Sequence, residues 1–178
     1  MKSGQAVKQS LRDMTTSRGR TVAALSHTQP VLLVFLRHFG CTFCREALQD
    51  LSNNLSRIER LGAGLVLVHM SDDKTANEYF DSYQLSGVEH VADPGCKHYR
   101  TFGLAKGTAR QLFGLHSWIR GFQAGVIDGH GVGYRPLGDG FQMPGVFVIK
   151  DGQVSGKFIH KLAGDRPAYV DLLQQCCS

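Results

Sequence analysis

Two cysteines three residues apart, Cys41 and Cys44, are the residues of this chain best suited to chemistry. They belong to the stretch RHFGCTFCRE, which follows six consecutive apolar residues at positions 31–36. A Cys-x-x-Cys pair can bind zinc, form a structural disulfide or act as a reactive thiol pair. The sequence contains no second Cys-x-x-Cys that would complete a four-cysteine zinc site. The pattern therefore favours a reactive pair.

The composition of the 178-residue chain is typical of one globular domain, with 42% hydrophobic and 20% charged residues. The net charge is +5, but Lys and Arg are scattered, so we expect no nucleic-acid partner. No apolar run is long enough for a secretory signal or a membrane span. Five cysteines is an odd number and shows no disulfide framework. We expect a cytoplasmic protein that does not bind membranes.

The cysteine pair lies between two predicted strands. Residues 31–36 and 64–70 are continuously apolar and rich in β-branched side chains, as in strands buried on both faces of a parallel sheet. Between them, apolar residues recur at steps of three and four from Cys44 to Leu61, which indicates one face of a helix. This order predicts a strand–helix–strand unit with a right-handed crossover.

The remainder of the chain predicts a second half of different design. Asp151-Gly152 between two apolar runs predicts an antiparallel hairpin. A helix that runs to about residue 83 is predicted after the capping residues 71–73. The other predicted elements are a strand at 88–92, helical turns at 96–102, one or two helices at 107–126, a glycine-rich loop at 129–140 and a helix at about 166–175. The fold class is thus α/β, a thioredoxin-like single domain with a central mixed β-sheet and helices on both faces. We expect residues 1–20 to be an N-terminal extension and residues 21–178 to be the domain.

The two thiols are expected to differ. Cys41 should be exposed at the helix N-terminus, where unpaired N–H groups and the helix dipole stabilise a thiolate. Arg37, His38 and Arg45 are close in sequence and would add to this effect. Cys44 shares the apolar face of the helix and should be more buried. We therefore predict that Cys41 is the nucleophile and that Cys44 is the resolving thiol.

Met143 and Pro144 directly precede the first strand of the predicted hairpin. In the thioredoxin fold a cis-proline occupies this place and packs against the thiol pair. We therefore expect Met143 and Pro144 to support the site, with a cis bond between them.

The stretch at residues 35–46 resembles the signature of peroxiredoxin-like proteins of the alkyl hydroperoxide reductase/thiol-specific antioxidant superfamily. Two later segments, at residues 93–103 and 138–147, are similar to that superfamily as well. The resemblance implies a thioredoxin-like fold and reduction of disulfides or peroxides at the cysteine pair. It also implies an external dithiol reductant of the thioredoxin or glutathione type. We expect no cofactor, no bound metal, and a monomer or weak dimer.

Two alternatives remain open at this point. Peroxiredoxins carry the pattern Pro-x-x-x-Thr-x-x-Cys, and aligning Cys44 with its cysteine places Cys41 at the threonine. That alignment makes Cys44 the peroxidatic thiol of a peroxidase. Alternatively, the two cysteines could form a non-enzymatic zinc- or copper-binding module together with His38 or with ligands from a partner. The other histidines show no metal-ligand spacing along the sequence.

Overall fold

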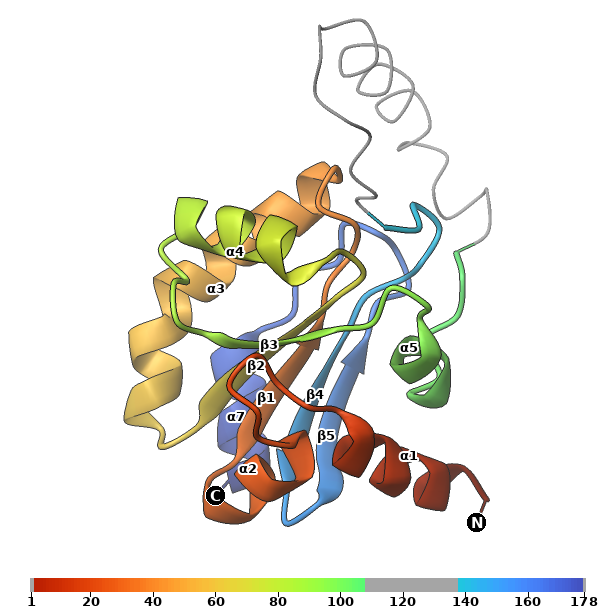
Figure 1. Cartoon of the computed structure of the whole chain (residues 1–178). Helices are drawn as coiled ribbons and strands as arrows, with labels where there is room; N and C mark the ends of the chain where they lie inside the picture. Colours follow the sequence, from red (N-terminus) through yellow and green to blue (C-terminus); the bar gives the residue numbers. More distant parts are fainter. Residues whose placement is uncertain (1, 108–137, 178) are drawn as a thin grey trace, which may run out of the picture.

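The apolar runs form the centre of a five-stranded mixed sheet (Figure 1). The structure is a computed structural model that describes residues 2–107 and 138–177. The strands are β1 (Val31–Phe35), β2 (Gly64–His69), β3 (Glu89–Ala92), β4 (Gly145–Lys150) and β5 (Gln153–Ile159), in the order β3-β2-β1-β4-β5. Strand β1 is parallel to β2 and antiparallel to β4, so the sheet joins a parallel half to a hairpin. The predicted mixed sheet is confirmed.

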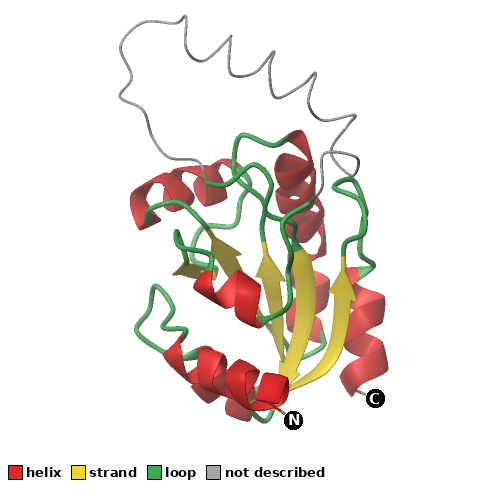
Figure 2. Ribbon diagram, turned by 90° about the vertical axis from the view of Figure 1, so that its right-hand side faces the viewer, coloured by secondary structure: helices red, strands yellow, loops and turns green. Residues whose placement is uncertain are grey.

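Helices cover both faces of the sheet (Figure 2), also as predicted. Side chains at alternate positions of β1 point to opposite faces, so Leu32 and Val34 belong to one core cluster and Leu33 and Phe35 to the other. The first cluster includes residues of α3 (Thr42–Arg60), α4 (Asp73–Ser82) and α7 (Tyr169–Cys177). The second includes residues of α1 (Lys2–Asp13), α2 (Val22–Thr28) and α5 (Lys97–Thr101).

The segment before residue 21 contributes to the core. Leu11 and Met14 are fully buried on the face of the sheet that α2 and α5 cover. Thr15 forms a β-bridge with Thr21. The division of the chain at residue 20 stays a prediction, but the side chains before it help to fill one of the two core clusters.

Local sequence signals fix most boundaries of the elements. The side chain of Asp72 caps α4 by accepting the N–H of Thr75 at 2.8 Å, as expected of an aspartate at a helix start. Asp151 and Gly152 both have positive φ, which is the backbone that a two-residue hairpin turn requires. The predicted helix at 107–126 and most of the predicted loop at 129–140 lie outside the described residues.

The last helix begins later than predicted, at Tyr169 rather than at Arg166. The side chain of Asp165 accepts the N–H groups of Lys161 and Leu162, which holds the preceding chain in a turn. Pro167 disfavours a helical backbone at the residue before it, so the helix cannot start there. Among the described residues, no helix is both long and apolar enough to cross a membrane.

Candidate active site

Both cysteines lie where the chain turns from β1 into α3. Cys41 is the N-cap residue of α3, with an extended backbone (φ −84°, ψ 131°), and Cys44 lies in the first turn. The carbonyl of Cys41 accepts the N–H groups of Cys44 at 3.0 Å and Arg45 at 3.2 Å. Both thiols are free. The two cysteines are thus three positions apart at the start of one helix, which is a spacing that a disulfide accepts.

The prediction that Cys41 is exposed is wrong, because only 3% of its surface is accessible. Phe39 is buried in the core cluster between the sheet and α3, and it draws the loop before Cys41 inward. The N–H of Cys41 donates to the carbonyl of His38 at 3.0 Å, which closes a tight turn at residues 38–41. Cys44 is 1% exposed, so the two thiols differ little in accessibility.

Burial strongly affects the ionisation of Cys44. Desolvation raises the pKa of the Cys44 thiol far above its ordinary value, and a charge on Cys41 raises it further. The positive charges of Arg37 and Arg45 and the backbone N–H of Arg37 act in the opposite direction without reversing the increase. Cys44 is therefore protonated in the resting protein, as the sequence predicts for the thiol on the apolar face.

Arg37 brings a buried positive charge to the pair. Its side chain is 2% exposed, and Nη2 donates to the carbonyl of Gly140 at 2.6 Å. Nε and Nη1 have no hydrogen-bond acceptor among the described residues. Burial lowers the pKa of Arg37, while the two cysteines and Asp139 favour its charged form. A cation with unused N–H donors is suited to stabilise an anion formed at either thiol.

His38 contributes differently from what the sequence suggests. Burial, followed by the charge of Arg37, lowers the pKa of His38 to about 4, and Asp139 opposes this shift. His38 is therefore neutral at pH 7 and cannot act as a second cation beside Cys41. Its side chain lies against Gly138 and Gly140 in the loop that returns to β4.

The prediction of a cis bond between Met143 and Pro144 is also wrong, since no peptide bond among the described residues is cis. A trans X–Pro bond is the more stable isomer by about 0.5–1 kcal/mol, and sequence position alone does not override that preference. The N–H of Met143 donates to the carbonyl of Ala105 at 3.3 Å, and the side chain of Gln142 donates to Leu104 at 2.9 Å. Pro144 nevertheless lies close to Cys44, in the wall of one cavity.

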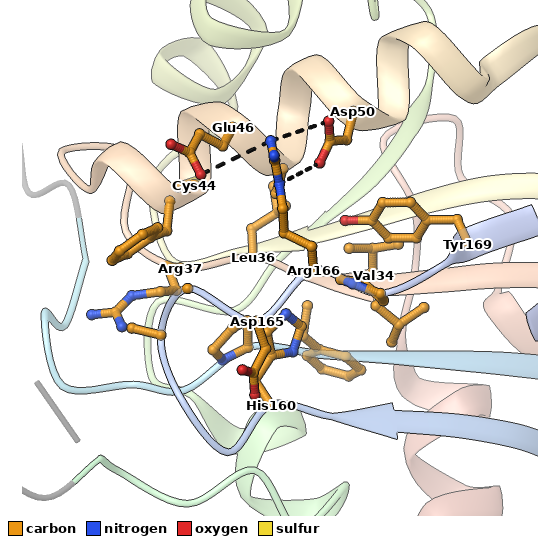
Figure 3. A pocket seen from close by; sticks show the side chains of 18 residues that line it. Val34, Leu36, Arg37, Cys44, Glu46, Asp50, His160, Asp165, Arg166 and Tyr169 are labelled. Carbon is orange, nitrogen blue, oxygen red and sulfur yellow. Dashed lines mark hydrogen bonds and ion pairs between the residues drawn. The ribbon is translucent and has the colours of Figure 1, made fainter.

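This cavity, of about 30 Å³, opens beside Cys44 (Figure 3). Cys44 of α3, Arg37 and Pro144 are among the residues that line it, whereas Cys41 is not part of its wall. A cavity measured in this way needs roughly 10–15 Å³ to hold one water molecule, so this one is large enough for a small group. A group of that size inside the cavity lies against Cys44 and Arg37.

The far wall of the cavity comes from residues that the sequence did not single out. His160 and Tyr169 line it, and Arg166 at its edge pairs with Asp50 at 3.1 Å and with Glu46 at 4.0 Å (Figure 3). Burial lowers the pKa of His160, so its ring is neutral at pH 7. These residues follow Cys44 by more than a hundred positions, and no periodic or motif signal connects them to it.

Among the described residues, neither Cys41 nor Cys44 belongs to a group of three side chains that could hold a metal ion. Within residues 2–107 and 138–177, one group of three His, Cys, Asp or Glu side chains is close enough to share an ion, and it consists of His69, Asp73 and His90. The geometry therefore gives no support to the metal-binding module with His38 as a third ligand.

The comparison with known proteins now decides the family, because residues 50–161 match the profile of the AhpC/TSA antioxidant enzymes. The chain belongs to this family. The matched region is more than half of the chain, but it begins after Cys44. Membership therefore supports a redox function of the peroxiredoxin and thioredoxin-like kind without identifying the thiol chemistry at residues 41–44.

Individual relatives agree with this assignment. The chain is 25% identical over 170 residues to the thioredoxin-like protein AAED1, chloroplastic, of Arabidopsis thaliana; the match covers 88% of this chain and 66% of that protein. The chain thus spans about two thirds of the length of this relative. Two solved structures resemble it: peroxidoxin BcpB of Mycobacterium tuberculosis (TM-score 0.63, 13% identity, 92% and 89% of the two chains) and peroxiredoxin Q of Xanthomonas campestris (0.64, 17%, 93% and 90%). They confirm the thioredoxin-like fold.

Proposed function

We propose that this member of the AhpC/TSA family is a thiol-dependent oxidoreductase that reduces peroxides or disulfides with the Cys41–Cys44 pair. The observation that carries the proposal is the position of two free thiols at the N-cap and in the first turn of α3, next to the buried guanidinium of Arg37. The helix N-terminus and Arg37 both favour an anion at this place.

We assign the first step to Cys41. With a peroxide, its thiolate attacks one oxygen, the O–O bond breaks, and the products are a Cys41 sulfenic acid and an alcohol or water. The Cys44 thiol then attacks the Cys41 sulfur, which forms the disulfide and releases water. With a disulfide substrate, Cys41 forms a mixed disulfide and Cys44 displaces the reduced product. The raised pKa of Cys44 supports this order, because the protonated thiol reacts second.

An external dithiol must return the Cys41–Cys44 disulfide to the reduced state, and we propose a reductant of the thioredoxin or glutathione type. A monomer or weak dimer and a cytoplasmic location stay predictions. The Arabidopsis relative is named as a chloroplastic protein.

A second candidate function is a peroxidase in which Cys44 attacks first. The cavity of about 30 Å³ favours it, because Cys44 and Arg37 line this space and Cys41 does not. Cys44 would then become the sulfenic acid, and Cys41 would close the same disulfide. The two mechanisms have the same product and differ in which thiol reacts with the substrate.

Single variants separate the two mechanisms. In reduced protein carrying Cys44→Ser, Cys41 should react fast with iodoacetamide and should trap mixed disulfides with a protein disulfide. Cys41→Ser should react slowly, because burial keeps Cys44 protonated. Cys96→Ser serves as a control, since Cys96 is buried in the cluster on the other face of the sheet. The reverse pattern would transfer the first step to Cys44.

Mass spectrometry tests the pair itself. After mild hydrogen peroxide, the wild-type chain should lose the mass of two hydrogen atoms, and peptide mapping should place the disulfide between Cys41 and Cys44. Two unmodified thiols at these positions after the peroxide treatment would refute both mechanisms. Stopped-flow rates with hydrogen peroxide and with a protein disulfide then identify the preferred substrate class.

A further inference from the structure

Three side chains capable of binding a metal meet between the carboxyl end of β2, the first half of β3 and the start of α4. His69 is the last residue of β2, His90 lies on β3, and Asp73 is the first residue of α4. In the parallel register His90 pairs with Leu67, two positions before His69, so both imidazoles point to the same face of the sheet. The chain that follows β2 leads into α4 and places the Asp73 carboxylate beside them.

The atoms that face one another are the right distance apart for a common cation. His69 Nε2 lies 2.9 Å from His90 Nδ1, and Asp73 Oδ1 lies 3.8 Å and 3.6 Å from these two atoms. Around tetrahedral zinc, with bonds of about 2.0–2.1 Å, donor atoms are about 3.3 Å apart. The three observed separations bracket that value, so binding requires shifts of only a few tenths of an ångström.

A neighbouring amide fixes the protonation of His90 in the form that a ligand needs. Asn77 Oδ1 lies 3.1 Å from His90 Nε2, and a carbonyl oxygen only accepts, so Nε2 carries the proton. His90 Nδ1 then accepts the N–H of His69 Nε2 at 2.9 Å, and a cation that binds both nitrogens takes the place of this proton. An outer partner that orients a histidine in this way is a regular feature of metal sites.

The surroundings hold both imidazoles in place while leaving the centre accessible. His69 and His90 are buried, and the ring of Phe80 lies with its centroid 5.9 Å and 5.3 Å from theirs. The side chain of Asp73 is 64% exposed, so an ion and water can reach the three donors from that side.

We propose that His69, Asp73 and His90 form a binding site for a divalent transition metal of the zinc class. Two imidazoles and one carboxylate are a ligand set for Zn²⁺ and its neighbours rather than for Mg²⁺ or Ca²⁺. Three protein ligands leave a fourth position for water. The site is separate from the cysteine pair and does not depend on the redox function.

The bound ion would join α4 to the two strands. Phe39, in the loop before Cys41, has its ring stacked on Tyr79 of α4 at a centroid distance of 4.5 Å and lies 5.9 Å from the ring of His69. The metal would therefore strengthen the wall on which the thiol-bearing loop rests, and it should raise the melting temperature.

The test is calorimetric titration of the reduced full-length protein with Zn²⁺ and, as a spectroscopic probe, Co²⁺. We expect one ion per chain, also in the Cys41→Ser/Cys44→Ser variant. The Co²⁺ form should show visible d–d bands without a thiolate-to-metal charge-transfer band. Asp73→Asn should weaken binding at least about tenfold, and His90→Gln should weaken it further, as expected for loss of a ligand.

Two controls keep the outcome decisive. Asp81→Asn changes an exposed aspartate of the same helix and should leave the affinity unchanged. Because His90 is buried, His90→Gln can fail to fold, and Asp73→Asn at the exposed position then decides alone. Absence of stoichiometric binding, binding that Asp73→Asn does not weaken, or binding that disappears with the cysteines would each refute the site.

Discussion

Arg37 is a buried cation whose replacement by methionine should make the reduced protein more stable and its first thiol slower. The guanidinium is 2% exposed and makes one hydrogen bond, to Gly140 at 2.6 Å, while Nε and Nη1 have no acceptor among the described residues. Methionine has a similar length and no polar hydrogen, so Arg37→Met removes the charge while filling most of its space.

The expected magnitude follows from these contacts. Two buried nitrogen atoms without an acceptor, Nε and Nη1, cost about 1–3 kcal/mol each, so their removal stabilises the protein by about 2–6 kcal/mol. Loss of the charged hydrogen bond to the carbonyl of Gly140 destabilises the folded protein by about 1.5–3 kcal/mol. The balance lies between about −1 and +4.5 kcal/mol, so we expect the free energy of unfolding to rise by about 2 kcal/mol, within the range found when buried ionic groups are replaced by apolar ones.

Reactivity should change in the opposite direction, because the charge of Arg37 favours the thiolate form of the pair. We expect the rate of iodoacetamide alkylation at pH 7 to fall about tenfold, the effect of losing about 1.4 kcal/mol of thiolate stabilisation. Urea unfolding of the reduced protein and stopped-flow alkylation measure the two quantities. Arg57→Met, on the exposed side of α3, is the control.

One result would refute this reasoning. If Arg37→Met lowered the free energy of unfolding by more than about 1 kcal/mol and left the alkylation rate unchanged, Arg37 would be a structural residue held by contacts that stabilise its charge. It would then have no part in activating the thiols.

Two further predictions concern the same end of the sheet. The pKa of His38 is about 4 in the folded protein, against about 6.5 when unfolded, so only the unfolded chain binds this proton between these values. The contribution of His38 to the free energy of unfolding should therefore fall by up to about 3 kcal/mol as the pH drops from 6.5 to 4, and no further below pH 4. In urea unfolding, His38→Gln should lose this part of the pH dependence, whereas His27→Gln at an exposed site should keep it. An equal pH dependence in both variants would contradict the assignment. Tyr99→Phe should lower the free energy of unfolding by about 1–3 kcal/mol, because the buried hydroxyl donates to the carbonyls of Leu36 at 2.7 Å and Val68 at 2.9 Å. Chemical denaturation measures this loss, with Tyr83→Phe as the control. An equal loss in both variants would show that the hydrogen bonds of Tyr99 do not stabilise the protein.

The sequence by itself determined the local elements and their order. Continuous apolar runs indicated strands buried on both faces, steps of three and four indicated α3, and Asp151-Gly152 indicated the hairpin. These signals are local, because side-chain period and turn chemistry depend on residues a few positions apart. The position of Cys41 and Cys44 at one helix start follows from the same signals, and so does the burial of Cys44, whereas the expected exposure of Cys41 is wrong.

What only the tertiary structure decided are contacts between residues distant in the chain. Phe39 and Cys41 are buried in one core cluster, and the carbonyl of Gly140 accepts from the side chain of Arg37. The same fold brings His160 to Cys44 and His90 to His69. The trans bond at Pro144 belongs here too, since the two isomers differ by only about 0.5–1 kcal/mol. Burial and ionisation depend on which atoms surround a group in space, and no spacing along one sequence specifies those atoms.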